Sequence, residues 1–352
     1  MKPKHKRLIL SAALATSCSA WAAPLQLGVA YGSDTQLNEA VRAGVKEAIH
    51  ELHGKVKSEK TNSLQALQSL SKTQQVIIST GNPDAVIQAA RSAPKVRFIS
   101  LESPAKPPQI PNINWLSFKD DESALSAGFV SGHKTNSGKV AVLISAGEIS
   151  AEKMQASAKA FERGLKMSCP TCKSQTKTVT KAEAQAETKK LISAGTDVIF
   201  VMGQAAPGVE AQIKKTPCIK MSSLPKGSTW RHQQWLTMPK STDYRKKCGG
   251  NTQPAFFIPA LQTNLRGDFD KNPATLNHAL TITLRHMQNA VKQSLLQASG
   301  LYTWKSGVQS YGLEHKSVGV LIDHYNRASL GDELIKKLGS LEKVISENRL
   351  NN

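Results

Sequence analysis

Segments with strand character alternate with segments of helical periodicity along most of this chain, and that alternation limits the folds open to it. Residues 25–30 form a short apolar run, after which Leu37, Val41 and Val45 begin a repeat of three or four residues that continues to Leu52. The same change of period predicts strands at 76–78, 96–101, 113–118, 138–144, 198–202, 219–221 and 318–322. It predicts helices at 37–52, 83–89, around 125–129, 150–166, 182–193 and 332–347. This order favours parallel sheets with helices on both faces.

The chain of 352 residues is longer than one ordinary domain core requires. Its hydrophobic fraction of 39% is enough for two modest cores, and the predicted strands suit two sheets better than one. In such sheets, ligands bind beyond the carboxyl ends of the strands. The polar positions directly after predicted strands are Asp34, Ser79-Thr80-Gly81, Glu102, Gly203-Gln204 and Ser222-Ser223.

The first residues have the pattern of a secretory signal peptide. Several basic residues precede an apolar stretch, and Ala20-Trp21-Ala22 places small residues where a signal peptidase cleaves. We predict a signal peptide at residues 1–22, cleaved after Ala22 or Ala23, and a periplasmic location. Lipid attachment at Cys18 is the alternative, and it is disfavoured because Leu14 lies one position too far from that cysteine.

The chain is strongly basic, with 46 Lys and Arg residues against 26 Asp and Glu residues and a formal net charge of +20. Removal of the predicted signal peptide lowers this charge to +16, because four basic residues leave with it. Such a charge suits a nucleic-acid binder, a surface-associated protein or a soluble protein. Export argues against nucleic acid as the partner. No later segment is apolar over the roughly 20 residues that a transmembrane helix needs.

Four cysteines follow the signal peptide, and an even number in an oxidising compartment favours disulfides. Of the three possible pairings we favour Cys169 with Cys172 and Cys218 with Cys248. A redox-active Cys-x-x-Cys pair is the alternative at Cys169. That motif usually opens a helix after a strand, whereas here it follows a helical run. The position therefore favours a structural bridge, and zinc is disfavoured because no His lies at ligand spacing.

The motifs of the common enzyme classes are missing from the sequence. It contains no Gly-x-Ser-x-Gly, Walker, His-Glu-x-x-His or Rossmann glycine motif. His50 and His53 share a predicted helix, but no third metal ligand accompanies them. We therefore expect a binding protein without a cofactor or metal, rather than an enzyme.

Five segments follow one another in the order found in a known family. Residues 28–40, with Asp34 and Asn38, are similar to its opening Asp-x-Ser-Phe-Asn motif, although Gln36 and Leu37 replace the Ser and Phe. Residues 195–200 read Gly-Thr-Asp-Val-Ile-Phe beside the family's Gly-Ala-Asp-Val-Ile-Phe. The other matching segments are residues 95–102, 118–128 and 311–320. The sequence thus resembles the basic membrane protein family, the nucleoside-type substrate-binding components of ABC importers.

The resemblance implies an α/β fold with two Rossmann-like lobes joined by a three-crossing hinge, the type I periplasmic-binding fold. We expect the chain to cross between lobes near Lys119, Pro225 and Gly300. The N-terminal lobe would comprise residues 24–119 and 225–300, and the C-terminal lobe residues 120–224 and 301–352. Residues 225–275 match nothing in the family and are expected to be an insertion.

The resemblance also implies a cleft for a small polar ligand such as a purine nucleoside. Asp34 and Asn38 would contact the base edge, Glu102 stands where the family has an aspartate, and Arg285 stands where it has a ligand-binding lysine. Ser222 replaces the family's ribose-binding aspartate. The remaining candidates are Gly203, which follows a predicted strand, and Tyr31, Trp230 and Trp235, which could replace the stacking Phe absent at Leu37.

Other roles for these residues and for the protein stay open. Asp34 could serve only as the N-cap of the helix that follows it. The protein itself is expected to be monomeric and to deliver its ligand to an ABC permease in the inner membrane. The alternative is a surface or periplasmic interaction or sensor protein that uses its basic charge to bind an acidic polymer, a membrane or a partner.

Overall fold

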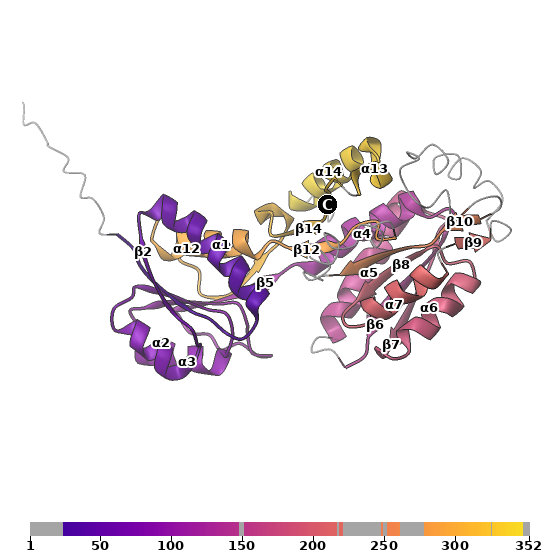
Figure 1. Cartoon of the computed structure of the whole chain (residues 1–352). Helices are drawn as coiled ribbons and strands as arrows, with labels where there is room; N and C mark the ends of the chain where they lie inside the picture. The colour runs from indigo at the N-terminus through magenta and orange to yellow at the C-terminus, as the bar shows by residue number, and fades with distance from the viewer. Residues whose placement is uncertain are drawn as a thin grey trace, which may run out of the picture.

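The computed structural model describes residues 24–147, 151–216, 218–220, 248, 252–260, 278–324 and 326–347. The expected signal peptide, Cys18, Ser222, Trp230 and Trp235 lie outside these residues, as does most of the expected insertion. The described chain forms two α/β lobes, each built around its own six-stranded sheet (Figure 1).

The sheet of the first lobe is entirely parallel, with the strand order β13-β5-β4-β3-β1-β2. Its strands are β1 (Gln26–Ala30), β2 (Lys55–Glu59), β3 (Val76–Ser79), β4 (Arg97–Ser100), β5 (Ile113–Phe118) and β13 (Gly307–Tyr311). Helices α1 (Thr35–Leu52) and α12 (Met287–Ala298) pack on one face. Helices α2 (Leu64–Ser71) and α3 (Pro83–Ser92) pack on the other. Both faces are therefore buried, as parallel sheets require.

The sheet of the second lobe has the order β14-β12-β11-β8-β6-β7, and only β14 is antiparallel to its neighbour. Its strands are β6 (Lys139–Ser145), β7 (Lys173–Val179), β8 (Val198–Met202), β11 (Phe256–Ala260), β12 (Thr283–Arg285) and β14 (Val318–Val320). One face is covered by α4 (Asp120–Lys134), α5 (Ala151–Ser168), α13 (Arg327–Leu330) and α14 (Asp332–Ser346). The other is covered by α6 (Ala184–Ser193) and α7 (Ala206–Lys215). Strands β9 (Cys218–Lys220) and β10 (Thr252–Pro254) form a separate antiparallel pair, and η2 (Leu313–His315) is a short 3₁₀ helix.

The chain crosses between the lobes at residues 118–120, 285–287 and 311–313, where the strands and helices of one lobe give way to those of the other. The first crossing is where the sequence predicted it. The crossing expected near Pro225 is wrong, because β11 pairs with β8 in the second sheet and the chain stays in that lobe through Arg285. The crossing expected near Gly300 is also wrong, because β13 pairs with β5 in the first sheet. The described lobes therefore comprise residues 24–118 with 287–311, and 120–285 with 313–347.

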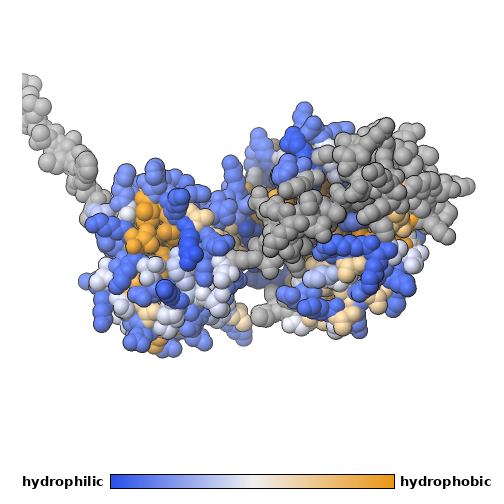
Figure 2. Space-filling model, in the orientation of Figure 1, coloured by the Kyte–Doolittle hydropathy of each residue, from blue (hydrophilic) through white to orange (hydrophobic). Residues whose placement is uncertain are grey.

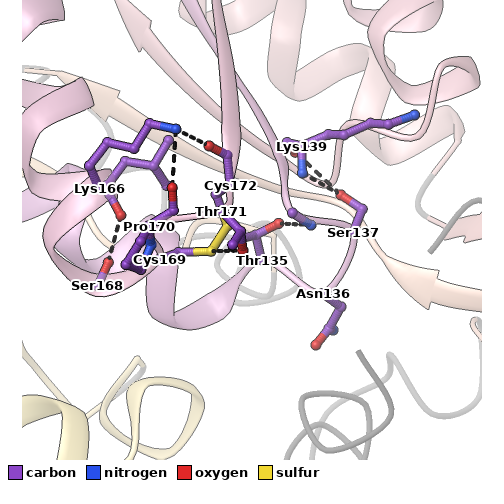
Figure 3. Close-up of a disulfide and its surroundings, with 12 residues drawn as sticks. Thr135, Asn136, Ser137, Lys139, Lys166, Ser168, Cys169, Pro170, Thr171 and Cys172 are labelled. Carbon is purple, nitrogen blue, oxygen red and sulfur yellow. Dashed lines mark hydrogen bonds between the residues drawn. A yellow bond between two sulfur atoms is a disulfide. The ribbon is translucent and has the colours of Figure 1, made fainter. Parts of the chain in front are cut away.

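The predicted disulfide pairing is confirmed. Cys169 and Cys172, with Cα atoms 5.3 Å apart, close the turn between α5 and β7, and Lys166 donates from Nζ to the carbonyl oxygens of Pro170 and Cys172 (Figure 3). Both cysteines are buried, which favours the structural role over the redox one. The second bridge joins Cys218 at the start of β9 to Cys248, with Cα atoms 5.5 Å apart.

Two glycines bring α4 and α5 into backbone contact. A Cβ atom built on Gly128 would lie 1.9 Å from the carbonyl oxygen of Phe161, and one on Gly164 would lie 1.9 Å from that of Leu125. The two helices therefore pack closer than any other residue type would permit at these positions. Among the described residues, no helix is long and apolar enough to cross a membrane.

Candidate functional site

A cavity of about 340 Å³ lies where the two lobes meet, at the carboxyl ends of the first-lobe strands. Its volume lies within the usual range for small-molecule sites, about 300–1,000 Å³. The first lobe supplies most of its wall, α5 supplies Lys153 from the second lobe, and the hinge supplies Phe118, Asp120, Arg285 and Met287. The first-lobe wall consists of Asp34, Leu37, Ala40, Leu101, Glu102, Ser103, Leu116 and Ser117.

Two carboxylates line the first-lobe wall at strand ends. Asp34 follows β1 and accepts a 3.0 Å hydrogen bond from the backbone N–H of Leu37 through Oδ1, so it caps α1. Glu102 follows β4, and its exposed side chain lies near Gly81 in the neighbouring loop. Asp34 therefore serves both the helix and the cavity, since one carboxylate oxygen can cap while the group still lines the wall.

An oriented arginine closes the hinge side of the cavity. Arg285 donates from Nε to Oδ1 of Asp120 at 2.8 Å and from Nη2 to Oδ2 of the same carboxylate. The guanidinium also lies over the ring of Phe118, 5.4 Å from its centroid. This bidentate pair and the ring contact fix the plane of the guanidinium, and its remaining N–H groups can donate to a ligand.

The sequence prediction missed two of the charged cavity residues, Lys153 and Asp120. Lys153 lies in the first turn of α5, where a cation opposes the helix dipole and so is unusual. Asp120 begins α4 within the acidic run Asp120-Asp121-Glu122, which the sequence showed only as a helix start. Lys153 reaches the cavity only through tertiary placement. Asp120 lies two residues after the predicted strand 113–118, so the rule that selected Asp34 could have found it.

Asn38 and Tyr31 do not line this cavity. The buried amide of Asn38 donates from Nδ2 to the carbonyl oxygen of Gly32 at 2.9 Å and accepts from Oγ1 of Thr80 at 2.9 Å. It thus ties the loop after β1 to the loop after β3. The guanidinium of Arg42 lies over the ring of Tyr31, 4.8 Å from the ring centroid. In this structure both residues shape the neighbouring loops.

The second-lobe candidates are not brought to the cavity either. Gly203 follows β8 as predicted, but it is not part of the cavity wall. Ser222, Trp230 and Trp235 lie outside the described residues. The structure therefore gathers Asp34, Glu102 and Arg285 from the predicted set and adds Asp120 and Lys153.

Charged contacts tie the three crossings together beside the cavity. Lys119, at the first crossing, lies 2.9 Å from Glu314 and 3.3 Å from Glu122. Although burial acts to lower it, hydrogen bonds to these carboxylates raise the pKa of Lys119. Glu122 also accepts a 2.6 Å hydrogen bond from the backbone N–H of Leu313, at the third crossing. Together with the Asp120–Arg285 pair, these contacts link all three connections of the hinge.

The comparisons with known proteins decide the family. The profile described as Bmp, ABC transporter substrate-binding protein PnrA-like, matches residues 24–218, which is more than half of the chain. The chain belongs to the PnrA-like family of substrate-binding proteins. This confirms the resemblance drawn from the sequence, and it assigns a substrate-binding role to the protein. No curated protein sequence is significantly similar to this PnrA-like chain.

Solved structures share the fold of this PnrA-like protein at low sequence identity. A transcriptional activator of the comK gene from Bacillus halodurans matches with a TM-score of 0.61 and 16% identity, covering 91% of this chain and 97% of that one. A solute-binding protein of an ABC transporter system from Conexibacter woesei DSM 14684 matches with a TM-score of 0.59 and 12% identity, covering 92% and 97%. One from Aeropyrum pernix K1 matches with a TM-score of 0.56 and 12% identity, covering 93% and 92%. At these identities the similarity establishes the two-lobed fold alone.

Across the described residues, no group of three or more His, Cys, Asp or Glu side chains is placed to hold a metal ion. The chemistry that the cavity offers is hydrogen bonding and charge. Carboxylates on one wall can accept hydrogen bonds from hydroxyl or amino groups, and the cations at the hinge and on α5 can donate hydrogen bonds to carbonyl, hydroxyl or anionic groups.

Proposed function

We propose that this protein is the exported binding component of an ABC importer, which binds a small polar ligand between its lobes and delivers it to a membrane permease. The observation that carries the proposal is the cavity at the three-crossing hinge, lined by charged groups from both lobes. Hinge closure around a ligand is the usual motion of such folds. The predicted signal peptide supports a periplasmic site of action.

Asp34, Glu102 and Arg285 are the proposed ligand contacts, with Lys153 joining them from the second lobe as the hinge closes. The carboxylates would accept from the ligand's hydroxyl or amino groups, and Arg285 would donate to an acceptor near the hinge. Among the described residues lining the cavity, the aromatic ring is that of Phe118, which Arg285 already covers. This arrangement supports a polar ligand generally, with purine nucleosides as one class to test.

A thermal-shift screen of the mature protein with nucleosides, bases, sugars and amino acids tests the proposal, because a ligand that binds only the folded state raises the melting temperature. We expect at least one hit. Arg285→Gln and Glu102→Gln should weaken binding of that hit by about tenfold to a hundredfold, as expected for lost charge-assisted bonds.

Glu210→Gln is the matched control, since Glu210 pairs with Lys214 on the surface of α7. Its affinity should equal that of the unmodified protein. A full panel without a hit, combined with salt-sensitive binding to heparin, would contradict the proposal and favour an acidic polymer as the partner. Binding that survives both cavity substitutions would place the ligand elsewhere.

A further inference from the structure

Exposed apolar side chains gather at one end of the first lobe. The large hydrophobic residues most exposed in the described chain include Leu301 at 64%, Tyr302 at 59% and Val308 at 47%, all within one eight-residue stretch. Gly300 turns the chain after α12 with a φ of +92°, which puts the Leu301–Tyr302 tip outside the helix. Figure 2 shows hydrophobic residues gathered on the first lobe toward the end that faces away from the second.

Side-chain contacts hold this tip against the body of the first lobe. Trp304 donates from Nε1 to the carbonyl oxygen of Pro111 at 2.9 Å, and the guanidinium of Arg97 lies 5.5 Å from the centre of its ring. Arg97 also donates to the carbonyl oxygen of Ala298, at the end of α12. The tip is therefore held against the start of β4 and β5. We call the apolar surface formed by Leu301, Tyr302, Trp304 and Val308 the lobe-end patch.

Basic residues outnumber acidic ones in the two sequence segments around the lobe-end patch, residues 91–115 and 271–313. On the neighbouring helix α1, Glu51 pairs with Lys292 of α12. Arg91, Lys95 and Lys305 are exposed and lie within these two segments. The ion pairs found among the described residues involve none of these three. No acidic residue occurs between Asp270 and Glu314, and the only one between Arg91 and Trp115 is Glu102, at the opposite end of the strands in the cavity wall.

The patch also lies at the end of the lobe where the described chain begins. All strands of a parallel sheet start at the same end of the sheet. The starts of β1, β4, β5 and β13 therefore lie together at the end opposite the cavity. Pro24, the first described residue, lies just before β1. A partner bound at this end of the first lobe would leave the opening between the lobes accessible.

We propose that the lobe-end patch docks the protein on an anionic phospholipid surface. Tyr and Trp rings with an adjacent aliphatic tip suit the interface between headgroups and acyl chains, and the surrounding cations suit anionic headgroups. Each basic residue near such a surface strengthens binding by roughly fivefold. The contact is weak and reversible, and it keeps the binding protein close to the membrane.

Co-sedimentation of the mature protein with vesicles tests this proposal, using phosphatidylglycerol mixed into phosphatidylcholine and phosphatidylcholine alone. We expect binding to the anionic vesicles only, with affinity that falls as salt rises. The double variant Leu301→Ser, Tyr302→Ser should lose about tenfold in affinity. Lys95→Gln with Lys305→Gln should lose about 25-fold, roughly fivefold for each lysine, and flatten the salt dependence.

Ile322→Ser is the matched control, because Ile322 is 37% exposed and lies in the second lobe. It should bind vesicles like the unmodified protein, and circular dichroism melting should show that all variants are folded. Absence of vesicle binding, or binding that the Leu301 and Tyr302 substitutions leave unchanged, overturns the proposal. Self-association that these substitutions abolish, without vesicle binding, would show that the patch contacts a second copy of the chain instead.

Discussion

Replacing Gly164 with alanine should destabilise the second lobe, although alanine is the better helix former. The added Cβ would lie 1.9 Å from the carbonyl oxygen of Leu125 and 2.9 Å from the backbone nitrogen of Phe129. Both neighbours are backbone atoms of α4, so no side-chain rotation can relieve the contact. The two helices would have to separate by roughly 1 Å or more to reach the shortest tolerable contact, which weakens the packing on both sides.

The magnitude follows from two opposed effects. Overpacking of a well-packed interface costs typically about 1–3 kcal/mol, and a clash with rigid backbone belongs at the upper end or beyond. Alanine recovers about 1 kcal/mol of helix propensity relative to glycine. We therefore expect Gly164→Ala to lower the free energy of unfolding by about 2 kcal/mol.

Urea denaturation followed by circular dichroism measures this change as a shift of the midpoint at constant slope. Gly339→Ala in α14 is the control, because a Cβ there meets no atom within 4 Å. That variant should gain about 0.5–1 kcal/mol, so the two substitutions should move stability in opposite directions. If Gly164→Ala stabilises the protein as Gly339→Ala does, the close contact between α4 and α5 is refuted.

Three further predictions follow from the site and the cores. Asp34→Ser should keep the N-cap of α1 and the melting temperature, yet lose ligand affinity by about tenfold or more, measured by calorimetry with the ligand from the screen; unchanged affinity would reduce Asp34 to a helix cap. Burial raises the pKa of Glu342 from 4.5 to about 7 in the folded protein, so the folded state holds the extra proton and stability falls as pH rises through that interval. Glu342→Gln should therefore be more stable than the unmodified protein at pH 8, by about 1–3 kcal/mol, and equal to it near pH 4, and equal curves of stability against pH would contradict this. Loss of the Cys218–Cys248 bridge, which spans 30 residues, should cost about 3–4 kcal/mol by loop entropy, against about 1.5 kcal/mol for loss of Cys169–Cys172. Urea denaturation of the two paired Cys→Ser variants measures both costs, and a larger cost for the Cys169–Cys172 variant would contradict the prediction.

Most of the buried strands could be predicted from the sequence because their signal is local, although β11 was missed even though all five of its residues are buried. The predicted strands at 113–118 and 198–202 have the same bounds as β5 and β8, whose apolar side chains face helices on both sides of a sheet. The edge strands β2 and β7 were missed. Their sequences, Lys-Val-Lys-Ser-Glu and Lys-Ser-Gln-Thr-Lys-Thr-Val, are mostly exposed and carry no continuous apolar run. Such strands form because a neighbour offers hydrogen bonds, which their own residues do not indicate.

The site residues also divide into those whose position the sequence predicted and those whose contacts it did not. Asp34 and Glu102 could be placed from the sequence, because each directly follows a strand and the carboxyl ends of parallel strands share one edge. Asn38 lies only four residues after Asp34, yet its amide is bound by Gly32 and Thr80, which the sequence did not indicate.

Tertiary structure alone decided which segments cross between the lobes and which second-lobe residues reach the cavity. Arg285 meets Asp120 across 165 positions of sequence, and Lys153 lines a wall otherwise built by the hinge and the first lobe. The crossings after β12 and β13 depend on which strand each pairs with, β11 and β14 in one sheet and β5 in the other. Local periodicity reports whether a segment is a strand and which of its faces is buried, but the choice of partner strand is set by packing between distant segments.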